Sequence, residues 1–234
     1  MTTPPQDDFI VQATGLVLSP FPDAVAFDFS VRPGEHWLLR GSSHSGKTPL
    51  LKTLCGLMSP AEGRVLLFGH DLGQLKPSAM LALRQRIGFV FSLDGLLPAW
   101  SGFENLALPL MYHQRATKAE IVARVDAFAT RYGVPDNWLN DPVGTLGAEK
   151  RMALALIRAL LVEPDLLFLD GLALDALIAF SGIRGVELIA DAVAGRCSVV
   201  LSLPADGSDS LPEVLGKVSF RTAEMSEGRL ECRA

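Results

Sequence analysis

Short apolar runs alternate with turn-forming residues along the chain, and the spacing of the apolar positions predicts both strands and helices. Strands are expected at residues 10–18 and 24–31, on either side of a proline-rich turn, and again at residues 36–40. Further strands are expected at 63–68, 87–91, 166–170 and 198–202, with a small terminal hairpin at 218–220 and 229–231. Helices at 49–57, 78–86 and 173–194 alternate with these strands, which is typical of an α/β core.

The middle of the chain has a different pattern. Helix-like segments at residues 103–112, 117–132 and 149–161 follow one another, joined by turns that contain Gly, Pro or Asn. This run of helices interrupts the alternation of strands and helices. We therefore expect one domain, in which an α/β core (residues 1–92 and 159–234) carries an inserted helical subdomain (residues 93–158).

The composition narrows the class of protein. Hydrophobic residues make up 49% of the 234 residues, enough to bury a sizeable core, and the net charge of −5 argues against a nucleic-acid-binding protein. No uninterrupted stretch of about 18 apolar residues is present, and no basic segment followed by an apolar one opens the chain. We expect a soluble, cytoplasmic chain that meets a membrane only through a partner. Cys55, Cys197 and Cys232 lack metal-site spacing and are expected to be idle thiols.

The main chemical motif is a phosphate loop that lies between a predicted strand and a predicted helix. It has the pattern G-x-x-x-x-G-K-[ST] and consists of Gly41, Ser42, Ser43, His44, Ser45, Gly46, Lys47 and Thr48. The glycines let backbone N–H groups turn toward a phosphate, the lysine adds a positive charge, and the threonine hydroxyl can ligate Mg²⁺. This context predicts nucleotide binding, and an ordinary glycine-rich turn is the alternative.

A second candidate is Asp170, which ends the apolar run 166–169. A carboxylate at the end of such a strand can hold Mg²⁺ beside a phosphate loop. Many buried strands also end in aspartate as a structural cap, which is the alternative interpretation.

The order of these segments resembles the ATP-binding subunit of an ABC transporter over essentially the whole chain. The resemblance includes Arg32-Pro33-Gly34-Glu35 before the loop, Pro60-Ala61-Glu62-Gly63, Arg86-Ile87-Gly88-Phe89, Glu104-Asn105-Leu106-Ala107, Arg158-Ala159-Leu160 and Glu227-Gly228-Arg229-Leu230. It implies a P-loop NTPase (RecA-like) fold: a three-layer core with a mainly parallel sheet, an N-terminal antiparallel β part and an inserted helical subdomain. It also implies ATP and Mg²⁺ as cofactors, a dimer of ATP-binding subunits and transmembrane permease partners. The stretch around residues 105–110 is most similar to subunits that serve lipid, lipoprotein or macrolide transporters.

The resemblance also assigns roles around the nucleotide. Phe21 stands where the family has an aromatic side chain that stacks on adenine, although a packing role explains it equally well. Ser92 stands where the family has a glutamine that ligates Mg²⁺, and the shorter hydroxyl puts that contact in doubt. His44 replaces a usual glycine and Pro49 a usual threonine. Both are compatible with binding, because histidine tolerates positive φ and proline tolerates the first turn of a helix.

The residues that the family uses for hydrolysis are replaced. Gly171 stands in place of the catalytic glutamate, and Pro204 in place of the switch histidine. In the signature segment, residues 144–148, Leu146 replaces a glycine and is expected to face the γ-phosphate bound by a partner. We therefore assign no catalytic residue and expect ATP binding with weak or absent hydrolysis, in a homodimer or with a related subunit. A slow ATPase that uses atypical residues and a scaffold that needs no nucleotide are the alternatives.

Overall fold

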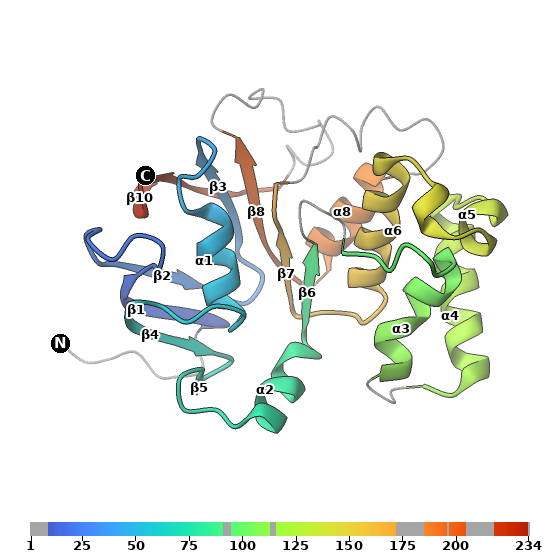
Figure 1. Ribbon diagram of the computed structural model, residues 1–234, viewed down its shortest axis with the longest axis horizontal. Coiled ribbons are helices and arrows are strands. Elements are labelled where there is room, and N and C mark those ends of the chain that lie inside the picture. Colours follow the sequence, from blue (N-terminus) through green and yellow to red (C-terminus); the bar gives the residue numbers. More distant parts are fainter. Residues whose placement is uncertain are drawn as a thin grey trace.

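Two sheets form the framework of the protein. The computed structural model describes residues 9–90, 95–112, 116–171, 185–195, 197–204 and 218–233. Within these residues, one sheet has the strand order β2-β1-β4-β5 and the other the order β10-β9-β3-β8-β7-β6. In Figure 1 the smaller sheet lies beside helix α1, and the helices α3 to α6 gather at the opposite end of the molecule.

The smaller sheet is antiparallel and confirms the expected N-terminal β part. Its strands are β1 (Val11–Val17), β2 (Phe27–Val31), β4 (Glu62–Leu67) and β5 (His70–Asp71). Val11 lies opposite both Val31 and Leu67, and all three side chains are buried. Val11 and Ala13, two residues apart, therefore both face the core, as the period of two along a strand requires, before an irregularity shifts the register later in β1. The short strand β5 lies outside the ranges expected from the sequence.

The larger sheet is mainly parallel, as expected. Its strands are β3 (His36–Gly41), β6 (Ile87–Val90), β7 (Leu166–Leu169), β8 (Ser198–Pro204), β9 (Arg221–Ser226) and β10 (Arg229–Arg233). Strands β6, β7, β8, β3 and β9 pair in parallel, and β10 pairs antiparallel with β9. The expected terminal hairpin exists, but the expected first strand, 218–220, is wrong. A two-residue turn at 227–228 requires that strand to end at Ser226.

Helices cover both faces of the parallel sheet. They are α1 (Lys47–Leu54), α2 (Pro77–Arg84), α3 (Gly102–Tyr112), α4 (Lys118–Tyr132), α5 (Asp136–Asn140), α6 (Ala148–Leu160) and α8 (Gly185–Ala194), with a 3-10 turn η2 (Val143–Thr145). The short helix α5 was not expected, and the part of the expected helix before residue 185 lies outside the described residues. No helix in the described ranges is both long and apolar enough to cross a membrane.

The central strands divide their side chains between two cores. Along β7, Leu166 and Phe168 pack with α1 and the antiparallel sheet, whereas Leu167 and Leu169 pack with α3, α4, α6 and α8. All four of these residues are fully buried. Strands covered on both faces must be apolar throughout, which explains the unbroken apolar run in the sequence. The result is the expected three-layer core (Figure 1).

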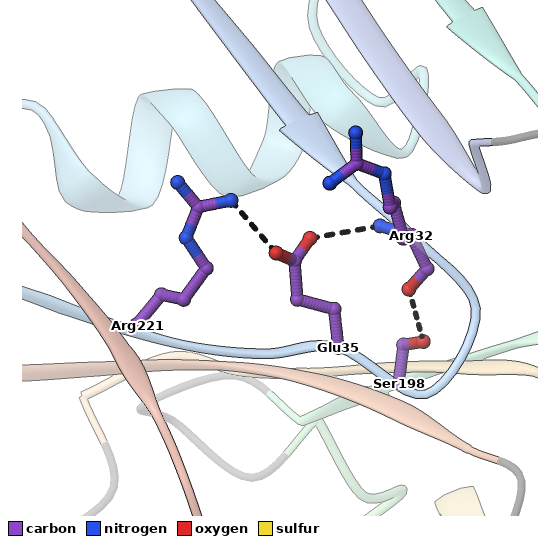
Figure 2. Close-up of polar contacts among 4 residues, drawn as sticks. All are labelled: Arg32, Glu35, Ser198 and Arg221. Carbon is purple, nitrogen blue, oxygen red and sulfur yellow. Dashed lines mark hydrogen bonds and ion pairs between the residues drawn. The ribbon is translucent and has the colours of Figure 1, made fainter.

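Polar contacts fix the turn that leads into β3. Figure 2 shows Glu35 accepting hydrogen bonds from the Arg221 guanidinium (2.7 Å) and from the Arg32 backbone N–H (2.9 Å). The Ser198 hydroxyl donates to the Arg32 carbonyl oxygen (3.1 Å) and accepts from Gly34 N–H (2.9 Å). Burial raises the pKa of Glu35, but the contacts with Arg221 and Arg32 outweigh it and hold the pKa below its ordinary value. The turn thus ties the beginning of β3 to β8 and β9.

Candidate nucleotide site

The phosphate loop connects the carboxyl end of β3 to the beginning of α1. A Cβ atom on Gly41 would lie 2.4 Å from the Met225 carbonyl oxygen, so no larger residue fits there without a shift. Gly46 has a φ of 112° and directly precedes α1, a backbone conformation that favours glycine. The two glycines of the motif are therefore required by packing and by backbone geometry. The free N–H groups at the start of α1 face the region where an anion would bind.

The two atypical loop residues do not disrupt this arrangement. His44 adopts a φ of 65°, the left-handed conformation that histidine tolerates better than most side chains. Pro49 is the third residue of α1, where its missing N–H breaks no helical hydrogen bond. It does remove one of the free donors of the first turn, so the helix offers one N–H fewer to a phosphate.

A cavity of about 530 Å³ lies over the loop. Its lining combines the phosphate loop with the ends of β7 and β8 and with the turn before β2: Pro20, Phe21, Ser43, His44, Ser45, Gly46, Lys47, Thr48, Pro49, Asp170, Gly171, Ser202, Leu203 and Pro204. The fold therefore brings together most of the candidate residues that the sequence indicated. Gly41 and Ser42 are not in this lining and contribute carbonyl oxygens that hold Lys47. Ser92 lies outside the described residues.

Lys47 is held by its own loop. Its Nζ donates to the carbonyl oxygens of Gly41 (2.6 Å) and Ser42 (2.8 Å) and to the Ser45 hydroxyl (3.3 Å). Burial lowers the pKa of Lys47, and the nearby carboxylate of Asp170 partly opposes that effect. The charged ammonium is thus placed beside the loop, where it can exchange these acceptors for phosphate oxygens.

Asp170 and Thr48 are in direct contact although 122 residues separate them. The Thr48 hydroxyl lies 2.8 Å and 3.0 Å from the two carboxylate oxygens of Asp170, which is 2% exposed. A hydroxyl and a carboxylate in this arrangement suit Mg²⁺, which usually takes few protein ligands and completes its shell with phosphate and water oxygens. Among the described residues no cluster of three or more His, Cys, Asp or Glu could hold a metal ion. The hydroxyl and carboxylate of the Thr48–Asp170 pair would suit a metal that arrives with a nucleotide.

Ser202 joins this network and was not identified from the sequence. Its hydroxyl donates to Asp170 (3.0 Å) and accepts from the Gly171 N–H (2.8 Å), and the side chain is fully buried. Leu169 pairs with Leu201, so the next residues along β7 and β8 become neighbours. Only this register reveals Ser202, because serine at the end of a buried strand carries no distinctive sequence pattern.

Phe21 lies at the edge of the cavity beside Gly46. A Cβ atom on Gly46 would lie 3.3 Å from Phe21 Cε2. The side chain is half-buried and packs against the core formed by β1, β3 and α1. The ring thus packs on the protein and also borders the cavity, and its stacking on adenine stays a prediction.

The positions expected to carry out hydrolysis offer no general base. Gly171 lines the cavity in a left-handed conformation (φ 61°), and its N–H is used by Ser202. Pro204 ends β8, pairs with Gly41 and also lines the cavity. Among the described lining residues, Asp170 is the only carboxylate, and it already accepts hydrogen bonds from the hydroxyl groups of Thr48 and Ser202.

The expectation for Leu146 is wrong. Its side chain is 9% exposed and packs in the helical core, so it does not face a γ-phosphate bound by a partner. Its backbone carbonyl accepts a hydrogen bond from Arg151 (2.7 Å), and the neighbouring Thr145 hydroxyl donates to the Pro142 carbonyl (2.8 Å). A large apolar side chain was expected to block the segment, but the backbone turns it inward.

Comparison with known proteins finds a family match and several relatives. The family model described as "ABC transporter" matches residues 25–172. The lipoprotein-releasing system ATP-binding protein LolD of Chromohalobacter salexigens is 36% identical over 146 residues, which are 62% of this chain and 61% of that protein. The cell division ATP-binding protein FtsE of Escherichia coli is 34% identical over 142 residues, which are 61% of this chain and 63% of that protein. The chain thus spans about three fifths of the length of the curated relatives it matches.

Solved structures share the fold over a longer range. The ATP-binding cassette MJ0796, in a dimeric post-hydrolysis state bound to ADP and Pi, has a TM-score of 0.76 and 20% identity, covering 96% of this chain and 99% of that chain. The protein cbiO1 from Clostridium perfringens, part of the complex cbiONQ, has a TM-score of 0.74 and 20% identity, covering 96% and 87%.

Proposed function

Because the chain belongs to the ABC transporter family, we propose that it is the ATP-binding subunit of a membrane transport complex, with weak or absent hydrolysis. The proposal rests on one cavity, whose lining suits nucleotide binding while the residues expected for hydrolysis are replaced. Its phosphate loop and the Thr48–Asp170 pair suit ATP and Mg²⁺. Gly171 and Pro204, which the family resemblance assigns to the hydrolytic positions, line the same cavity. The chain therefore binds nucleotide mainly as a structural or regulatory element.

Binding has support from each part of the site. The start of α1 supplies N–H donors and the positive end of a helix dipole, and Lys47 supplies a charge. Thr48 and Asp170 are the residues that would hold Mg²⁺. When bound, the metal neutralises phosphate charge and orients the triphosphate. The cavity also extends to Phe21, where a base can stack.

Hydrolysis lacks a proton acceptor at the required place. A positioned general base typically contributes about 10²–10⁴-fold in rate, and a donor to the developing charge contributes further. The backbone N–H of Gly171 cannot serve as a base, and Pro204 has neither a titratable side chain nor an N–H. A water molecule beside a γ-phosphate would therefore meet no carboxylate other than Asp170 among the described lining residues.

The partners follow from the family and stay proposals. We propose a dimer of ATP-binding subunits, formed with a second copy or with a related chain, seated on transmembrane permease subunits at the inner face of the cell membrane. The LolD relatives are named as parts of a lipoprotein-releasing system, which favours a lipid-related substrate. In a heterodimer with a complete relative, this chain would be the half that binds ATP without cleaving it.

An ATP-binding titration of the purified chain tests the proposal. The Lys47→Ala variant should lose most of the affinity for ATP with Mg²⁺, whereas the Lys52→Ala variant should bind as the wild type does. Lys52 is a suitable control because it lies on the same helix but not in the cavity lining. Equal affinity of wild type and Lys47→Ala, or no binding by the wild type, would favour a scaffold that needs no nucleotide.

A turnover assay separates weak hydrolysis from none. If the chain is a slow ATPase, phosphate release by the wild type should exceed that of Asp170→Asn, which weakens the metal site. Equal rates in the two proteins, with ATP bound to the wild type, are the expected result.

A further inference from the structure

The turn of the terminal hairpin touches the phosphate loop. Glu227 and Gly228 form the two-residue turn between β9 and β10, with φ angles of 49° and 77°. The Gly228 N–H donates to the Ser45 carbonyl oxygen at 2.9 Å. Ser45 is 3% exposed, so this is a buried contact between segments more than 180 residues apart in the sequence. The loop is therefore held from outside by the hairpin as well as by its own hydrogen bonds.

The same turn also packs against the side chain of Phe21. A Cβ atom on Gly228 would lie 2.5 Å from both Cβ and Cγ of Phe21, far inside contact distance. On its other side, Phe21 approaches Gly46, whose own Cβ would lie 3.3 Å from the Cα of Gly228. The ring thus packs against two glycines, one in the phosphate loop and one in the hairpin turn.

We propose that the Glu227–Gly228 turn is a positioning element of the nucleotide site and that Gly228 sets how strongly the aromatic base of a nucleoside triphosphate is held. This inference rests on the proposed function, because it assigns a role in the binding of that nucleotide. Phe21 would touch the base, and Gly228 acts through Phe21. The absence of a side chain at position 228 lets the ring lie directly on the turn and border the cavity.

A side chain at position 228 would act mainly on the base. An alanine methyl group must push Phe21 away from the turn or move the turn away from Ser45. Displacing the ring removes stacking on the base but leaves Lys47, Thr48 and the helix N–H groups in place for phosphates. The expected signature is therefore a loss of affinity for ATP that is larger than the loss for a triphosphate without a base.

The chain provides a matched control for the substitution. The turn between β4 and β5, Phe68–Gly69, has φ angles of 49° and 78°, nearly those of Glu227–Gly228. A Cβ atom on Gly69 would meet no heavy atom within 4 Å. Gly69→Ala and Gly228→Ala therefore impose the same backbone strain in the same kind of turn, and only Gly228→Ala collides with Phe21.

The experiment measures the affinities for ATP and for inorganic tripolyphosphate, both with Mg²⁺. Gly228→Ala and Phe21→Ala should each weaken ATP binding about 5- to 100-fold, the range expected for one base stacked on an aromatic ring, and change tripolyphosphate binding by less than about threefold. Gly69→Ala should bind both ligands as the wild type does. Hydrogen exchange of the wild type provides a second measurement if Gly228→Ala does not fold. The Gly228 amide should exchange more slowly with ATP than with tripolyphosphate.

Two outcomes would overturn the inference while the proposed function stands. One is a wild type that binds ATP, together with a Gly228→Ala variant that keeps the same ratio of the two affinities. The other is equal exchange of the Gly228 amide with ATP and with tripolyphosphate. A wild type that binds neither ligand would instead refute the proposed function.

Discussion

Replacing Ser202 by alanine should separate stability from metal binding. The substitution leaves the Gly171 N–H without its acceptor and removes one donor from the buried Asp170 carboxylate. A neutral buried hydrogen bond contributes about 0.5–1.5 kcal/mol and one to a charged group about 1.5–3 kcal/mol, so we expect a loss of about 2–4.5 kcal/mol. The carboxylate would then be positioned by Thr48 alone.

Ser198→Ala is the matched control. Ser198 is also fully buried and lies on the same strand four residues earlier. Its hydroxyl likewise donates once, to Arg32 (Figure 2), and accepts once, from the Gly34 N–H. Its loss should cost about 1–3 kcal/mol, because both partners are neutral. The expected losses of stability of the two variants therefore overlap, whereas only Ser202→Ala disturbs the Asp170 carboxylate.

The assays are urea unfolding and ATP titration with Mg²⁺ or with EDTA. Both variants should unfold at lower urea concentration than the wild type. Only Ser202→Ala should show a smaller gain in ATP affinity on addition of Mg²⁺, by about tenfold if one charged hydrogen bond orients the ligand. The reasoning is refuted if Ser202→Ala keeps the wild-type gain, or if Ser198→Ala loses it as well.

Three other substitutions have direct readouts. Glu35→Gln should flatten the dependence of the unfolding free energy on pH. The lowered pKa of Glu35 contributes stability that is present above about pH 4.5 and is lost as the pH falls through the folded-state pKa. An unchanged stability profile at acid pH would contradict this. Leu146→Ala should destabilise the protein by about 2–5 kcal/mol in urea unfolding, because it leaves a cavity in the helical core; a change below about 0.5 kcal/mol would mean that the side chain is not packed there. Gly171→Glu should leave ATP turnover near the wild-type rate, since position 171 has a φ of 61°, which is unfavourable for glutamate, and Pro204 still offers no phosphate contact. A rise of about 10²-fold in phosphate release would show that the missing carboxylate alone limits hydrolysis.

Local patterns predicted what depends on neighbours in the sequence. The phosphate loop was recognised because its glycines, lysine and threonine lie within eight consecutive residues, and Asp170 because it ends an apolar strand. The alternation of strands and helices in an α/β core was predictable for the same reason, since periods of two and 3.6 mark strands and helices. The P-loop NTPase fold itself was implied by the family resemblance. The left-handed backbone conformation of His44 was also predictable, because histidine tolerates positive φ better than most side chains.

Contacts that depend on strand register could not be predicted in this way. Ser202 reaches Asp170 only because β7 and β8 pair at Leu169 and Leu201. Gly228 reaches Ser45 only because β9 adds to the edge of β3. The direction of the Leu146 side chain was missed because it is set by η2 and the start of α6, whose geometry the family resemblance does not fix.

Strand β8 carries a polar anchor at each end. Ser198 binds the turn that leads into β3, and Ser202 binds the carboxylate of Asp170 toward the other end of the parallel strands. A slip of β8 by one residue against both β3 and β7 would reverse which side chains face each core and would break both anchors together. Two separate contacts thus fix the register of β8. A folding intermediate with β8 out of register would lose hydrogen bonds at both of these positions, even before any ligand is present.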